Sequence, residues 1–104
     1  MKRFCFWKRF IVENGVLVKY KGKETRVTIP DTVTVIGANA FYGNRELVEV
    51  IIPDGVTEIQ RSAFLDCTNL KTVHAPTSVA HIGNFAFCNC KNLCNISLPN
   101  IELI

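Results

Sequence analysis

Short stretches in which apolar and polar residues alternate recur along the chain at a constant spacing. Residues 47–53 have the pattern Leu-x-x-Val-x-Ile-Pro, and residues 70–76 and 93–99 repeat it with conservative changes. Alternation places the apolar side chains on one face of an extended segment. The closing proline lacks a backbone N–H and ends the hydrogen-bonded run. The pattern therefore predicts one short β-strand, with one buried face, in every unit.

The 23-residue spacing is kept in several further columns of the sequence. They are Pro30, Pro53, Pro76 and Pro99; the Ala-Phe pairs at 40–41, 63–64 and 86–87; Leu47, Leu70 and Leu93; Ile36, Ile59 and Ile82; and Val33, Val56 and Val79. Residues 25–93 thus form three units of 23, and a partial fourth unit follows. A repeat of this length indicates a protein built from stacked supersecondary units.

The remainder of each unit predicts a second extended segment and a tight turn. Residues 56–59, Val-Thr-Glu-Ile, contain β-branched side chains that favour extended structure. In the next segment Phe64 and Cys67 lie three residues apart, which favours one helical or 3₁₀ turn. No unit can bury its apolar face alone. Stacking of successive units then forms a continuous core, so we predict a repeat solenoid that is mainly β with short helical or 3₁₀ turns.

The two ends of the repeat array differ. Asn14-Gly15 starts a strand-like stretch at residues 16–18, and Lys21-Gly22-Lys23 is a turn sequence that leads into residues 25–29. We predict that residues 10–24 form a capping β-hairpin that covers the first unit. Residues 1–9 form a basic and aromatic arm before this cap. Residues 25–104 form the solenoid, whose fourth unit stops soon after Pro99. We expect this uncapped end either to be closed by its own last strand or to pair with another copy of the chain, which would make a homo-oligomer.

Taken together, the pattern Leu-x-x-Val-x-Ile-Pro-x-x-Val-x-x-Ile-x-x-x-Ala-Phe-x-x-Cys-x-x-Leu resembles the repeat of the BspA-like leucine-rich repeat proteins. Residues 47–70 match it in full, residues 70–93 match it except for Ala75, and residues 25–47 depart at Asn44. The resemblance covers about residues 10–104. It implies a short right-handed leucine-rich-repeat-like superhelix. For function it implies a ligand-binding surface of the kind found on bacterial adhesins.

Composition and charge narrow the class of protein. The chain has 104 residues, of which 48% are hydrophobic and 20% charged, with no apolar run long enough to predict a transmembrane segment. The net charge of +3 is unevenly distributed. Residues 1–26 contain eight basic and two acidic side chains, and the remainder is mildly acidic. Without a secretory signal, we expect a cytoplasmic protein if the chain is complete, and a cell-surface or secreted one if it belongs to a longer family member.

Several residues suggest chemistry at first sight. Cys88, Cys90 and Cys94 lie close together, but no fourth ligand with the spacing of a zinc site accompanies them. The repeat places Cys67 and Cys90 in one core column, where parallel side chains disfavour a disulfide between them. His74 and His81 occupy columns without a recurring acid or nucleophile. We therefore predict no enzyme activity, no metal and no cofactor.

The remaining candidate is a surface. Between the buried positions of the main strand lie two columns of outward-facing side chains, and we predict that they bind a protein partner. The residues of this predicted strand face are Arg26, Thr28, Glu49, Ile51, Thr72, His74, Asn95 and Ser97.

Two alternatives to a protein-interaction module remain open. The basic and aromatic residues of the arm at positions 2–10 are suited to peripheral binding of a membrane surface or a polyanion, without specific recognition of nucleic acid. Alternatively, the chain is a structural fragment of a longer surface adhesin.

Overall fold

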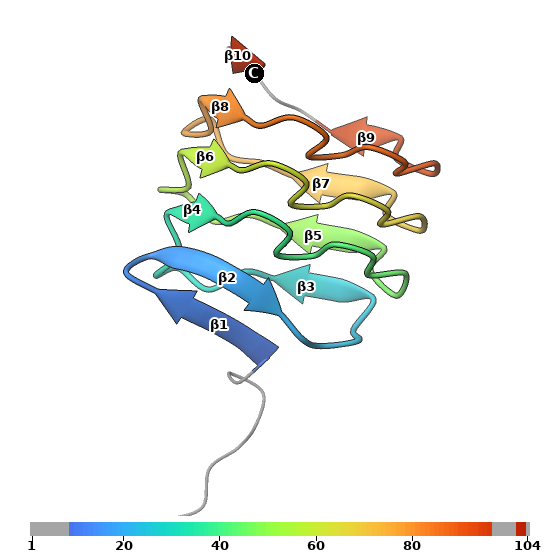
Figure 1. Ribbon diagram of the computed structural model, residues 1–104, viewed down its shortest axis with the longest axis horizontal. Coiled ribbons are helices and arrows are strands. Elements are labelled where there is room, and N and C mark those ends of the chain that lie inside the picture. Colours follow the sequence, from blue (N-terminus) through green and yellow to red (C-terminus); the bar gives the residue numbers. More distant parts are fainter. Residues whose placement is uncertain (1–8, 97–101, 104) are drawn as a thin grey trace, which may run out of the picture.

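The computed structural model describes residues 9–96 and the backbone of residues 102–103, which form a two-sided ladder of short strands. Figure 1 shows the strands stacked in two columns, with each turn of the chain contributing one strand to each column. One sheet has the order β1-β2-β4-β6-β8-β10 and the other the order β3-β5-β7-β9. The strands are β1 (Phe10–Glu13), β2 (Val16–Tyr20), β3 (Arg26–Thr28), β4 (Val35–Ile36), β5 (Glu49–Ile51), β6 (Glu58–Ile59), β7 (Thr72–His74), β8 (His81–Ile82), β9 (Asn95–Ile96) and β10 (Glu102–Leu103).

The sequence repeat and the strand register coincide. In the four-stranded sheet Val27 lies opposite Val50, and Val50 lies opposite Val73, in parallel pairing. In the other sheet Ile36 pairs with Ile59 and Ile59 with Ile82, again in parallel. Equivalent residues of successive units therefore stack directly upon one another. This confirms the predicted β-solenoid of leucine-rich-repeat type.

The predicted columns form the core between the two sheets. The side chains of Val27, Val50 and Val73 are buried, as are the leucines at 47 and 70. Phe41 and Phe64 are among the largest fully buried side chains. Burial of a large apolar side chain stabilises a fold by about 1.5–3 kcal/mol. Stacked identical columns are thus the main source of stability in this chain.

The Ala-Phe segments do not form the helical or 3₁₀ turn that the spacing predicts. Each is a series of β-turns in which alternate N–H groups bond three residues back, as in Tyr42 N to Asn39 O at 3.2 Å. The intervening N–H groups reach the next unit, as in Phe41 N to Ala63 O at 2.7 Å. Asn39 has a φ of 61°, and a right-handed helix requires negative φ at every residue. Positive φ recurs at the equivalent Ser62 and Phe85, so the correction applies to all three units.

The N-terminal hairpin lies against the first unit of the solenoid. β1 and β2 pair in antiparallel fashion around Asn14 and Gly15, whose φ angles of 51° and 80° are those of a tight hairpin turn. β2 then pairs in parallel with β4 through Leu17, which stacks on Ile36. The hairpin therefore extends the sheet by two strands, of which β2 lies on β4 and covers the first apolar layer.

Burial decreases toward the last described unit. Phe64, Cys67 and Leu70 are fully buried, whereas the equivalent Phe87, Cys90 and Leu93 are only partly buried. The ring of Phe64 is stacked between those of Phe41 and Phe87, whereas Phe87 has one stacked ring, that of Phe64, among the described residues. The burial of an equivalent residue, and so its contribution to stability, thus depends on the position of its unit in the stack.

Candidate functional site

The face of the β3-β5-β7-β9 sheet carries seven of the eight residues that the sequence predicts as a binding surface; Ser97 lies outside the described residues. On β3, β5 and β7 a central buried residue is flanked by more exposed ones, as Val27 is by Arg26 and Thr28. The strand alternation that buries the valine column therefore also presents its neighbours to solvent. We refer to Arg26, Thr28, Glu49, Ile51, Thr72, His74 and Asn95 as the strand face.

Parallel register arranges the strand face in two columns. Arg26, Glu49, Thr72 and Asn95 follow one another in the first column. Thr28, Ile51 and His74 form the second. The columns contain both charges, hydroxyls and one apolar side chain. This composition is that of a mixed surface, not of a strongly charged or strongly apolar one.

Glu49 connects the two columns. Its Oε1 lies 3.3 Å from Nε of Arg26 on the strand before, and its Oε2 lies 2.6 Å from Nε2 of His74 on the strand after. The Glu49 side chain is 29% exposed, compared with 67% for Arg26 and 51% for His74. Exposed ion pairs contribute at most about 1 kcal/mol to stability. Their larger effect is to hold three side chains in one arrangement across three rungs.

The contact between His74 and Glu49 is one that the sequence does not predict, because the two residues lie in different columns and 25 positions apart. A carboxylate beside a histidine also orients catalytic bases. In the part of the chain that the structure describes, however, the side-chain hydrogen bond of His74 goes to Glu49 and none joins it to a hydroxyl or thiol. The pair is therefore a fixed polar feature of the strand face.

A shallow depression adjoins this pair at the C-terminal part of the sheet. It has a volume of about 430 Å³ and is lined by residues of β7, β9 and the positions beside them, including Thr72, His74, Cys94 and Asn95. Ala75 and Ile96 supply apolar wall. The lining of the depression thus combines apolar side chains with polar ones, among them His74, Thr72 and Asn95 of the strand face.

The cysteines do not form a metal centre in the described part of the chain. No group of three or more His, Cys, Asp or Glu side chains converges there in a way that could hold an ion. Cys67, Cys88, Cys90 and Cys94 are free thiols. The Cys67 Sγ donates a hydrogen bond to Phe41 O at 3.0 Å, and Cys90 makes the same contact with Phe64 O at 3.1 Å. These two cysteines thus connect successive units within the core.

Burial controls the acidity of the core thiols. It raises the pKa of Cys67 to about 12, because the thiolate would lose its hydration in an apolar environment. Burial also raises the pKa of Cys90. Since the thiolate is the nucleophilic form, Cys67 is an unreactive structural residue at neutral pH.

One cluster of charged residues was missed in the sequence. Lys19, Lys21 and Lys23 of the hairpin and its following loop line a hollow together with Arg45 of the first unit. The alternation of the three lysines along residues 19–23 is the sequence feature that indicates this cluster. Their approach to Arg45 depends on how the loop packs against the solenoid, which the pattern does not reveal.

The comparisons with known proteins define the class as a bacterial-type leucine-rich repeat solenoid. The family model described as "BspA type Leucine rich repeat region (6 copies)" matches residues 18–104. The chain therefore belongs to the BspA-type leucine-rich repeat family. None of the curated proteins matches it.

Crystal structures of three bacterial proteins show the same fold. A T. pallidum leucine-rich repeat protein superposes with a TM-score of 0.81 at 28% identity, over 85% of this chain and 44% of its own. A leucine-rich cell surface protein of Faecalibacterium prausnitzii gives 0.75 at 38% identity, over 84% of this chain and 27% of its own. A leucine-rich repeat protein of Bacteroides capillosus superposes with a TM-score of 0.78 at 28% identity, over 86% of this chain and 75% of its own. The chain thus spans less than half the length of the first two.

Among the residues that the structure describes, there is no helix with the length and apolar character needed to cross a bilayer. The basic arm predicted to contact membranes or polyanions lies almost wholly outside the described residues, which begin at Arg9.

Proposed function

We propose that the chain is a non-catalytic protein-interaction module that binds a protein partner through the strand face. The observation that carries this proposal is the Arg26–Glu49–His74 network, which fixes charged groups of both signs across three rungs of an open sheet. Fixed side chains lose little conformational entropy when a partner contacts them. Repeat proteins bind partners through such continuous surfaces.

The depression beside His74 supports the same function. Protein interfaces combine an apolar centre with a polar rim. The strand face offers the half-buried Ile51 as apolar area, and Glu49, His74 and Asn95 as polar groups around it. The face is small, so we expect a transient complex of moderate affinity.

The relatives suggest where the module acts. The Faecalibacterium prausnitzii protein is a cell surface protein and is much longer than this chain. We propose that this chain likewise acts at a bacterial cell surface, as part of a longer adhesin or beside one. An envelope or host matrix protein is then the expected partner.

Substitution of the network residues tests the proposal. The full chain is immobilised and exposed to extracellular-matrix and cell-envelope protein fractions, and each captured protein is purified for affinity measurement. We expect Glu49→Lys and His74→Glu to weaken binding by about tenfold or more, since each introduces a repulsive charge at the centre of the face. Arg61→Glu, on an exposed turn away from this face, is the matched control and should bind like the unmodified chain. Equal binding by all three variants would discard the strand face as the binding surface.

A further inference from the structure

A basic hollow lies between the N-terminal hairpin and the first unit of the solenoid. Its volume is about 340 Å³, and it is lined by residues 19–23 on one side and residues 41–46 on the other. Four of these side chains are cationic, namely Lys19, Lys21, Lys23 and Arg45, and one is acidic, Glu46. The hollow belongs to neither the strand face nor the basic arm.

The positive charge of the hollow is not neutralised within the protein. Among the described residues the ion pairs are Arg9–Glu24, Arg26–Glu49 and His74–Glu49, and none of them includes a cation of the hollow. Lys19 alone of the four makes a side-chain hydrogen bond, from Nζ to Asn39 O at 3.3 Å. Four cations against one carboxylate leave the hollow with excess positive charge, and a concave surface with excess charge of one sign attracts counter-ions.

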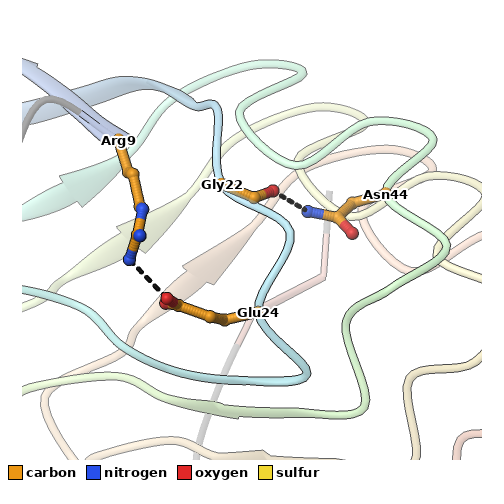
Figure 2. A network of polar contacts seen from close by, with 4 residues as sticks. All are labelled: Arg9, Gly22, Glu24 and Asn44. Carbon is orange, nitrogen blue, oxygen red and sulfur yellow. Dashed lines mark hydrogen bonds and ion pairs between the residues drawn. The ribbon is translucent and has the colours of Figure 1, made fainter. Parts of the chain in front are cut away.

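The loop that carries Lys21 and Lys23 is held at several points. Figure 2 shows the ion pair between Arg9 and Glu24 and the hydrogen bond from Asn44 Nδ2 to Gly22 O, which is 3.5 Å long. Gly22 also lies directly on the hydroxyl of Tyr20, because a Cβ at this position would overlap it. These contacts fix the loop backbone against both the hairpin and the first unit.

The opposite wall is held as well. Asn44 Oδ1 accepts hydrogen bonds from the N–H groups of Glu46 and Leu47, at 3.0 and 3.1 Å. Asn69 Nδ2 donates to Arg45 O at 2.6 Å. Arg45 therefore extends from a turn whose backbone is fixed on both sides. A site whose walls are ordered before binding loses less entropy when a ligand enters.

We infer that this basic hollow binds a negatively charged saccharide, one that carries sulfate or carboxylate groups. Lys21, Lys23 and Arg45 supply the charge for those groups, and the Tyr42 ring, which is 50% exposed, supplies an apolar face for a sugar ring. The volume lies within the usual range of small-ligand sites. A single-stranded nucleic acid would require several stacking rings, whereas Tyr42 is the one exposed ring among the residues that line the hollow.

The test measures binding of a sulfated heparin tetrasaccharide to the full chain by calorimetry, with neutral maltotetraose as the uncharged probe. We expect the triple variant Lys21→Ala/Lys23→Ala/Arg45→Ala to lose about tenfold or more in affinity. The matched control Arg61→Ala/Lys71→Ala/Lys91→Ala removes the same charge from exposed positions elsewhere and should lose less than about threefold. Lys19 is left unchanged because its hydrogen bond to Asn39 O contributes to the structure. Circular dichroism and thermal melting establish that each variant is folded.

Two further variants separate saccharide binding from unspecific attraction of anions. Tyr42→Ala should weaken binding, and Tyr42→Phe, which keeps the ring, should restore it. A poly-glutamate peptide of equal charge should bind more weakly than the tetrasaccharide. An equal affinity for the peptide, or a Tyr42→Ala variant that binds normally, would contradict the inference of a saccharide. Equal losses in the two triple variants would contradict the site itself.

The other basic and functional surfaces serve as independent checks. Lys2→Ser/Arg3→Ser/Lys8→Ser removes charge from the arm and should leave tetrasaccharide affinity within about threefold. A complete loss in this variant would assign binding to the arm and overturn the inference. Glu49→Lys should leave tetrasaccharide affinity unchanged, because the strand face is a separate surface; loss of binding in this variant would show that the two surfaces are not separate.

Discussion

The ring of Tyr20 in the hairpin stacks on the ring of Phe41 in the first unit, with 5.1 Å between the centroids and 29° between the planes. The stack continues from Phe41 to Phe64 at 4.8 Å and from Phe64 to Phe87 at 5.1 Å. Phe10 lies on the outer side of Tyr20 at 4.9 Å. The hairpin thus extends a column of the repeat with a residue that lies outside the 23-residue pattern. Through this stacking of aromatic rings the hairpin cap and the solenoid form one continuous core.

The loss of stability on truncating a ring of this column should depend on the position of the ring in the stack. We predict that Phe64→Ala lowers the free energy of unfolding by about 3–5 kcal/mol, because this ring is fully buried between two others. Phe87→Ala should cost less, since Phe87 is only partly buried. Urea denaturation followed by circular dichroism measures both. A loss below about 1 kcal/mol for Phe64→Ala would contradict the proposed core.

Removal of the Tyr20 hydroxyl, unlike truncation of a ring, should not lower the stability of the protein. It is buried, and it is the one buried side-chain polar atom without a hydrogen-bond partner in the described part of the chain. Burial is the main cause that raises the pKa of Tyr20, and Glu24, the residue that comes nearest to being a hydrogen-bond partner of this hydroxyl, also affects the pKa. Removal of an unsatisfied buried hydroxyl relieves a desolvation cost of about 1–3 kcal/mol. We expect Tyr20→Phe to be as stable as the unmodified protein or more so, in thermal unfolding. A clear loss of stability would show that the hydroxyl has a partner.

Asn44 replaces the cysteine of the other two units, and its role differs accordingly. Its side-chain oxygen accepts hydrogen bonds from two backbone N–H groups that begin the next strand segment, those of Glu46 and Leu47. We predict that Asn44→Ala costs about 1–2 kcal/mol, as loss of a comparable cap does. Asn44→Asp keeps both acceptor bonds and loses only the long bond to Gly22 O, so it should cost less. Chemical denaturation of both variants provides the comparison, and equal losses would contradict the role of the oxygen.

Alkaline pH should destabilise the protein through Cys67. Burial raises the pKa of this thiol from 9.0 to about 12 in the folded chain. Below pH 9 both states keep the proton, and between the two values only the unfolded state loses it. The contribution of Cys67 to the free energy of unfolding therefore decreases as pH rises through this window, by at most about 1.4 kcal/mol per pH unit.

Comparison with Cys67→Ala isolates this contribution. The stability of the variant should decrease less steeply between about pH 8 and about pH 10.5, because it lacks the thiol that titrates in the unfolded state. Reversible denaturation at a series of pH values measures both slopes. Cys67→Ala will itself lower stability at neutral pH, so the slopes and not the absolute values are compared. Parallel slopes would contradict the raised pKa.

The repeat made most of the fold predictable from the amino-acid sequence. Residues at the same position in each unit, such as Val27, Val50 and Val73, have the same environment, so one pattern determines many contacts at once. The strand face followed from the same alternation, because side chains beside a buried column must point outward. The helical turn was predicted wrongly, since apolar spacing does not reveal the positive φ at Asn39, Ser62 and Phe85.

The sequence by itself therefore determined the period, the core columns and which side chains of each strand face solvent. Tertiary structure alone decided the diagonal contact of Glu49 with His74 and the joining of Lys21, Lys23 and Arg45 around one hollow. The reason is physical. The period specifies which equivalent residues stack on one another, so the core columns can be predicted from the sequence. The contact of Glu49 with His74 and the hollow join residues at different positions of different units. These contacts depend on how side chains and an irregular loop pack in three dimensions.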